Sequence, residues 1–193
     1  MLIDQLKDYQ LILASKSPRR QFLLKDLGLD FIIQTKEVDE SFSETLQREE
    51  IPLYLCRKKA AAFQSDLKSN SLLITADTIV WVDNQVLNKP ENYEDAIRML
   101  KMLSGKMHEV ITAVCLKSKN KSVSFFVKTN VFMKNFTNEE LDYYITTYKP
   151  YDKAGAYGAQ EWIGYIGIEK IEGSYFNVMG LPLKELYEEL QQF

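Results

Sequence analysis

Residues 11–24, LILASKSPRRQFLL, decide how this chain begins to fold. Residues 10–14 are mostly apolar and predict a short buried strand, whereas Ser15, Lys16 and Ser17 are typical of a turn. Ser17 can cap the N-terminus of a helix whose first residue is Pro18. The sequence therefore predicts a strand that leads into a helix through a polar loop.

Two arginines, Arg19 and Arg20, follow in the first turn of that helix. Basic side chains there oppose the helix macrodipole and are poor choices for helix stability. An anion, most simply a phosphate group, held between the arginines and the loop would explain their placement. The alternative is a solvated arginine pair after a simple Ser17-Pro18 cap, and this stretch alone does not separate the two.

The bulk composition is that of an ordinary globular protein. The 193 residues suffice for one large domain or for two small lobes that share a core. Hydrophobic residues make up 46% and charged residues 26%, which argues against disorder. With 24 basic and 27 acidic residues the net charge is −3, so no general attraction to nucleic acid or to an acidic membrane is expected. Any phosphate binding must therefore be local.

The cysteines and the apolar runs restrict the compartment. Cys56 and Cys115 form neither a disulfide framework nor a metal-binding spacing, and we expect two buried free thiols. No apolar run reaches membrane-spanning length, and residues 1–9 are too polar for a signal peptide. We therefore predict a cytoplasmic protein.

Helical and strand patterns alternate along the rest of the chain. The polar stretch 36–49 follows neither period and is expected to form an ordered loop or lid. No repeat or low-complexity linker divides the chain, so residues 1–193 are predicted to form a single domain. We expect the first helix to end at Gly28, further helices at 53–67, 93–103, 137–148 and from 183, strands at 31–34, 72–82, 85–87, 109–116 and 123–133, and further short strands before 180.

Residues 149–158, KPYDKAGAYG, are unusual in composition. The segment has few apolar anchors, four small residues and a charged pair, Asp152 and Lys153. Glycine and alanine suit positions where the backbone approaches a ligand closely. This segment is therefore a candidate binding loop.

Asp77 is the most informative single residue, because it interrupts the apolar strand pattern of 72–82. Ionised carboxylates are rarely buried unpaired, so Asp77 needs a cation, a metal or a role in proton transfer. A purely structural salt bridge is the alternative. Glu40 and Glu44 in the polar loop offer a second carboxylate for a hard divalent ion.

Other candidates are weaker. Lys59 and Lys89 stand beside structure-defining neighbours, Ala60 and Pro90, with an ordinary surface lysine as the alternative for each, and Lys58 fits a surface position better. His108 is the only histidine and has no nucleophile motif beside it, so we interpret it as structural. Trp81 and Trp162 are expected in the core, and a stacking platform is the alternative for Trp162 because it lies close to Gln160.

Several separated motifs together resemble one protein family. They occur in order over nearly the whole chain, which is more specific than any one of them. They are SKSPRR at 15–20, VDE at 38–40, Lys59-Ala60, ADT at 76–78, NKP at 88–90, LSG at 103–105, DKAGAYG at 152–158 and GLP at 180–182. In these motifs the chain resembles the Maf family of nucleoside triphosphate pyrophosphatases.

The resemblance implies an α/β fold like that of the inosine-triphosphate pyrophosphatases, with an extended mixed sheet and two lobes around a central cleft. It implies metal-dependent hydrolysis of a nucleoside triphosphate to the monophosphate and pyrophosphate, with Mg²⁺ as the expected ion and Mn²⁺ as the alternative. Asp77 would accept the proton of the attacking water, and Glu40 and Asp77 would hold the metal. Substrate-binding residues would be Ser15, Arg20, Lys59, Lys89, Asp152 and Lys153.

The branch of the family that acts on dTTP and UTP resembles this chain at Arg19, Thr78 and Gln160. A glutamine side chain both donates and accepts, which suits the imide edge of uracil or thymine. The alternatives are a pyrophosphatase for 7-methyl-GTP or modified nucleotides, and a non-catalytic nucleotide-binding regulator of septum formation. Both a monomer and a homodimer are left open.

The chain departs from the family pattern at three places. Asn88 stands where glycine is common, and Ala159 where isoleucine is common. Glu161 and Trp162 replace a glycine-led turn, and they put a charge and a bulky ring beside the expected base pocket.

Overall fold

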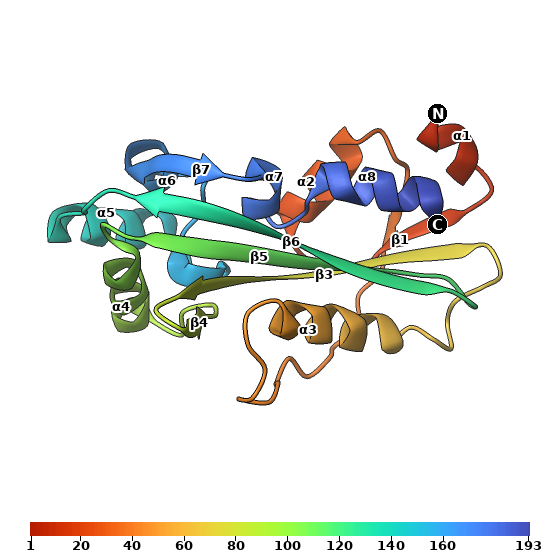
Figure 1. The fold of residues 1–193 in the computed structure, drawn as a ribbon, viewed down its shortest axis with the longest axis horizontal. Helices are drawn as coiled ribbons and strands as arrows, with labels where there is room; N and C mark the ends of the chain where they lie inside the picture. Colours follow the sequence, from red (N-terminus) through yellow and green to blue (C-terminus); the bar gives the residue numbers. More distant parts are fainter. The chain divides into compact units, whose positions relative to one another are not determined.

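The computed structural model describes residues 1–193 and contains one seven-stranded mixed sheet with the order β2-β1-β3-β5-β6-β7, with β4 paired to β3 (Figure 1). The strands are β1 (Gln10–Leu13), β2 (Ile32–Ile33), β3 (Ser71–Val82), β4 (Gln85–Leu87), β5 (Met107–Lys117), β6 (Ser122–Met133) and β7 (Ile168–Glu172). β1 runs parallel to β2 and β3, whereas β4 and β7 pair antiparallel with β3 and β6. The predicted α/β class with a mixed sheet is confirmed.

Helices connect these strands. They are α1 (Leu2–Leu6), α2 (Pro18–Asp26), α3 (Glu50–Ala61), α4 (Tyr93–Leu103), α5 (Asn138–Tyr148), α6 (Trp162–Gly167), α7 (Tyr175–Val178) and α8 (Leu183–Gln192), with a 3₁₀ turn η1 (Ala154–Ala156). None of these helices has the length and apolar content needed to cross a membrane.

The chain forms two compact units. The first comprises Met1–Asp77, Thr112–Val127 and Gly180–Phe193, and the second comprises Thr78–Ile111 and Lys128–Met179. Two units agree with the expected two lobes. A single domain over 1–193 and a central cleft stay predictions.

In the first unit, α3 packs against the sheet (Figure 1). Cys56, Ala60 and the following Phe63 bury their side chains with Leu73 of β3 and Cys115 of β5. Both cysteines are free and buried as predicted, and burial raises the pKa of the Cys56 thiol to about 12. The core therefore fixes which side of α3 faces β3.

The core of the second unit joins α4 and α5 to the ends of the long strands. Asn92 caps α4, and Thr137 with Glu140 forms the predicted capping box of α5. His108 is buried, and its Nε2 lies 2.7 Å from the hydroxyl of Tyr157. Burial lowers the pKa of His108 to about 3, so a neutral structural histidine is confirmed.

The expected run of short strands before residue 180 is wrong. Only β7 forms there, flanked by α6 and α7. The backbone N–H groups of Gly164 and Tyr165 donate to the carbonyl of Glu161, which starts a helical turn. A Cβ at Gly164 would lie 2.1 Å from the carbonyl oxygen of Ala159, so only glycine allows this close packing. Tertiary packing thus overrides the strand propensity of the neighbouring aromatic and β-branched residues.

Replacement of Gly155 by alanine tests how tightly the second unit is packed around this residue. Its φ is +70°, and a Cβ there would lie 2.9 Å from Cγ2 of Val80. Gly28 also has positive φ, +78°, but a Cβ there meets only Cδ1 of Ile3 at 3.6 Å.

We expect Gly28→Ala to lower the free energy of unfolding by about 1–2 kcal/mol because of backbone strain. Gly155→Ala should cost about 1–3 kcal/mol more, because overpacking adds to that strain. Urea denaturation of both variants measures the difference, and equal costs would contradict the packing account.

Candidate active site

A hydrogen bond between α3 and β3 sets the register of the site. The hydroxyl of Thr75 donates to the carbonyl of Cys56 at 2.7 Å, and both groups are buried. Lys59 lies three residues after Cys56, about one helical turn on, and Asp77 lies two residues after Thr75, on the same face of the strand. The bond therefore brings the Lys59 side chain to Asp77.

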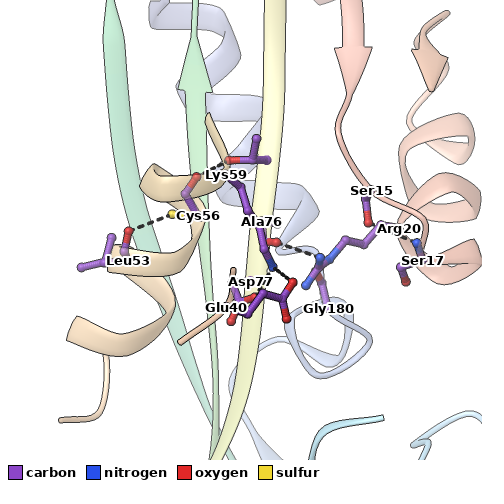
Figure 2. A network of polar contacts seen from close by, with 11 residues as sticks. Ser15, Ser17, Arg20, Glu40, Leu53, Cys56, Lys59, Ala76, Asp77 and Gly180 are labelled. Carbon is purple, nitrogen blue, oxygen red and sulfur yellow. Dashed lines mark hydrogen bonds and ion pairs between the residues drawn. The ribbon is translucent and has the colours of Figure 1, made fainter. Parts of the chain in front are cut away.

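Lys59 lies between two carboxylates (Figure 2). Its Nζ is 2.6 Å from Oδ1 of Asp77 and 2.9 Å from Oε1 of Glu40. The Asp77 side chain is 12% exposed and that of Glu40 is 52% exposed, so solvent screens the Glu40 contact far more. Asp77 thus has the cation that its place in an apolar strand required.

Arg20 is held beside this cluster by backbone carbonyls. Its Nε donates to Gly180 and its Nη1 to Ala76, each at 2.8 Å (Figure 2). Burial lowers the pKa of the Arg20 guanidinium, and the nearby Asp77 carboxylate opposes that shift. The first turn of α2 therefore presents a fixed positive charge next to Asp77.

The loop before α2 differs in one detail from the prediction. Ser17 occupies the N-cap position, but its side chain makes no capping hydrogen bond. Instead the buried Oγ of Ser15 accepts the backbone N–H of Ser17 at 3.2 Å. The amide of Gln21 donates to the Ser15 carbonyl at 3.1 Å, which adds a second constraint on this turn.

The loop that carries Glu40 is attached to α3 by a second ion pair. Lys58 Nζ lies 3.0 Å from Oδ2 of Asp39 and 3.3 Å from the carbonyl of Ser41. Hydrogen bonds from Ser41 and then from Lys58 lower the pKa of Asp39 to about 2, so Asp39 is charged at neutral pH. Asp39 with Lys58 and Glu40 with Lys59 are thus two adjacent contacts between loop and helix.

A similar cluster lies in the second unit. Lys153 Nζ is 2.7 Å from Oδ1 of Asp152 and 3.0 Å from Oε1 of Glu161, and the Lys153 side chain is only 9% exposed. Glu161 Oε2 accepts the hydroxyl of Tyr144 at 2.5 Å. The Glu161 carboxylate therefore contacts Lys153 and Tyr144 of the protein itself. The sequence had predicted that it lies beside the base pocket.

The remaining predicted residues have different surroundings. Lys89 is exposed and has no ion pair or hydrogen bond, and it lies in a surface groove of about 570 Å³. Gln160 is partly exposed, and its backbone carbonyl accepts the hydroxyl of Tyr165. Arg19 and Thr78 are both partly exposed. Lys89 thus forms no ion pair, although Glu91, Glu94 and Asp95 line the same groove.

Sequence reasoning missed three contributors. Lys58 was assigned to the surface, although it contacts Asp39 next to the predicted Glu40. Tyr144 was not singled out, and Glu161 was noted only as a departure from the family pattern. The signal available for Lys58 was its place beside Lys59. No local pattern indicated Tyr144, because its partner lies 17 residues away.

The fold and the site define a class: an α/β protein in which lysine, arginine and paired carboxylates meet beside the middle of strand β3, as phosphate chemistry requires. Comparison with known proteins gives the family. Residues 10–193 match the family described as Maf-like protein. This chain belongs to the Maf family, as its motifs indicated.

Full-length relatives carry one description. A protein from Bacteroides fragilis that is described as dTTP/UTP pyrophosphatase is 52% identical to this chain over 192 residues. The match covers 99% of this chain and all of the relative. In Parabacteroides distasonis the identity is 50% over 193 residues, covering all of both chains. A solved nucleoside-triphosphatase (dITP/XTP pyrophosphatase) from Mycobacterium abscessus is 11% identical, with a TM-score of 0.37, and covers 64% of this chain and 74% of that one. That likeness is too low to support an argument.

The Asp39–Lys58 contact predicts a salt-sensitive loop. We expect Asp39→Asn to raise amide hydrogen exchange at residues 38–45 up to about fivefold, since an exposed ion pair stabilises a loop only weakly. Glu37→Gln is the matched control, because Glu37 lies in the same loop without a partner. High salt should bring the wild-type exchange close to that of the variant. Equal exchange in Asp39→Asn and wild type at low salt would refute this role.

Proposed function

We propose that this chain is a pyrophosphatase that hydrolyses dTTP and UTP to the monophosphate and pyrophosphate. The observation that carries the proposal is the pairing of Asp77 with Lys59 and of Lys59 with Glu40, beside the fixed guanidinium of Arg20. The relatives described as dTTP/UTP pyrophosphatase, about half identical over their full length, support the substrates. A pure nucleotide binder would need the cations but no carboxylate base.

In the proposed reaction a water oxygen attacks the α-phosphorus, and the bond from that phosphorus to the bridging α–β oxygen breaks. Asp77 accepts the proton of the water, and the electron pair of the broken bond leaves with pyrophosphate. A carboxylate suits this role when it is held near the nucleophile and kept ionised. The contact with Lys59 and the nearby Arg20 guanidinium place positive charge beside the Asp77 carboxylate.

The carboxylates also fit a divalent metal. Mg²⁺ in nucleotide enzymes is usually held by one or two carboxylates together with phosphate oxygens and water. Glu40 and Asp77 converge on one cation, the Lys59 ammonium, so both are near enough to serve a common ion. We propose that these two residues hold Mg²⁺, or alternatively Mn²⁺, which would neutralise charge on the phosphates.

The other predicted residues receive roles in binding. We propose that Ser15, Arg20, Lys59 and Lys89 contact the phosphates, and that Arg19, Thr78 and Gln160 select the base. The charges and hydrogen-bonding groups of these side chains suit those ligands. Asp152 and Lys153 are proposed to line the nucleotide site. A cytoplasmic location, the lack of nucleic acid and membrane partners, and a homodimer as an alternative to a monomer stay predictions from sequence.

Replacement of the base tests the mechanism directly. We expect Asp77→Asn to lower kcat for dTTP about 10²–10⁴-fold, because a general base contributes about that much, while nucleotide binding persists. Asp83→Asn is the control, since Asp83 forms only an exposed pair with Lys106. The measurement is pyrophosphate release from dTTP, UTP, CTP, GTP and 7-methyl-GTP, with Mg²⁺ and with chelator.

The panel separates the alternatives. Release led by dTTP and UTP and abolished by chelator supports the proposal. Release led by 7-methyl-GTP would keep the mechanism and overturn the substrates. Binding without release by the wild-type protein would favour the regulator, and unchanged release by Asp77→Asn would refute the assigned base.

Base selection is tested at Gln160. Gln160→Met keeps the side-chain length but removes its hydrogen bonds, so the preference for dTTP over CTP in kcat/KM should fall about tenfold, since one lost pairing costs about 1–3 kcal/mol. Gln5→Met, at an exposed position of α1, is the control. An equal loss for every nucleotide would show that Gln160 does not select the base.

A further inference from the structure

Both oxygens of the Glu161 carboxylate are engaged within the second unit. Oε1 lies 3.0 Å from Nζ of Lys153, and Oε2 accepts the hydroxyl of Tyr144. That same hydroxyl oxygen accepts the backbone N–H of Gly158 at 3.0 Å. The Glu161 side chain therefore links Lys153 to Tyr144 of α5 and, through the Tyr144 hydroxyl, to the backbone of Gly158.

The missing side chain at Gly158 leaves space for the Glu161 side chain. A Cβ at Gly158 would lie 2.8 Å from Cδ of Glu161, so the carboxylate packs directly over a glycine. The backbone N–H of Glu161 donates to the Gly158 carbonyl at 3.0 Å, which closes a turn. Glu161 thus fixes both the start and the end of the turn that contains Gln160.

Tyr144 connects the turn to the rigid part of the unit. Its side chain is fully buried in the core and stacks on Tyr148, with ring centroids 5.2 Å apart. Burial and the Glu161 carboxylate raise the pKa of Tyr144, so the phenol stays protonated and remains a donor. The carboxylate is therefore held by a group that cannot move without disturbing α5.

Glu161 is the better shielded of the two carboxylates that contact Lys153. The two partners of Lys153 differ in exposure, since the Asp152 side chain is 58% exposed and the Glu161 side chain is 20% exposed. A buried cation that loses its buried partner is strongly disfavoured, because solvent does not replace that contact. Without the Glu161 charge, Lys153 is expected to turn toward Asp152 and solvent.

We infer that Glu161 is a positioning residue for nucleotide binding. By linking Lys153, Tyr144 and Gly158 it holds residues 152–160, which carry the proposed nucleotide contacts Asp152, Lys153 and Gln160, in one conformation. The inference rests on the proposed function of this segment. It gives a role to a charge that replaces the glycine-led turn common in the family.

The test is steady-state hydrolysis of dTTP by Glu161→Gln in the full chain. Glutamine keeps the size and the acceptor for Tyr144 but removes the charge that holds Lys153. We expect KM to rise about tenfold, equivalent to about 1.4 kcal/mol, with kcat within about threefold of wild type. Glu172→Gln is the matched control, because it removes an exposed carboxylate in the same unit whose partners are Lys170 and the Asn130 side chain.

A double-mutant cycle asks whether Glu161 acts through Lys153. If it does, Glu161→Gln added to Lys153→Met should raise KM less than twofold beyond Lys153→Met alone, because the interaction is already lost. Thermal unfolding of each variant separates this effect from a general loss of stability. A structural role alone would lower the melting temperature and leave KM unchanged.

The outcomes are distinct. An unchanged KM in Glu161→Gln, or fully additive effects in the cycle, overturns the inference while the proposed function stands. A wild-type protein that neither binds nor hydrolyses dTTP overturns the proposed function and this inference with it. A raised KM with non-additive effects and near-normal kcat supports the positioning role.

Discussion

The contact of Lys59 with two carboxylates is the interaction on which the candidate site depends. Asp77 and Glu40 carry like charges, and a cation between them is what allows both to lie close. The position of Lys59 follows from the packing of α3 on the sheet and from the bond between Thr75 and Cys56. The site is therefore a consequence of how one helix is seated on one strand.

The second unit also contains a lysine that contacts two carboxylates, but the exposure of its side chains differs from that at Lys59. Lys153 also has two carboxylate partners, but it is more buried than Lys59, and its buried partner Glu161 is tied to a core tyrosine. Such a lysine can hold a segment in place through its two carboxylate partners. Lys89, exposed and without a counter-ion, has the opposite character. These environments distinguish cations that order the protein from one that is available to a ligand.

Local patterns were sufficient for most of the fold. Strand β3 follows from the apolar pattern and the start of α5 from its capping box, and both signals act over a few residues. Asp77 could be identified from the sequence because a charged residue interrupts the apolar pattern of its strand. The helices α6 and α7 and the role of Glu161 were not, because they depend on contacts such as Gly164 with Ala159 and Tyr144 with Glu161. Pairing across the chain leaves no periodic signal.

The two contacts of Lys59 also differ in what they imply for motion. The pair with Asp77 joins two packed elements and is largely shielded from water, so it persists as long as α3 stays on the sheet. The pair with Glu40 and the neighbouring pair of Lys58 with Asp39 are exposed and hold only a loop without regular structure. Solvent screens these exposed pairs, so they hold the loop less firmly than the Lys59–Asp77 pair joins α3 to the sheet. In the proposed mechanism Glu40, the metal ligand, therefore lies on an exposed loop, whereas Asp77, the base, lies on a packed strand.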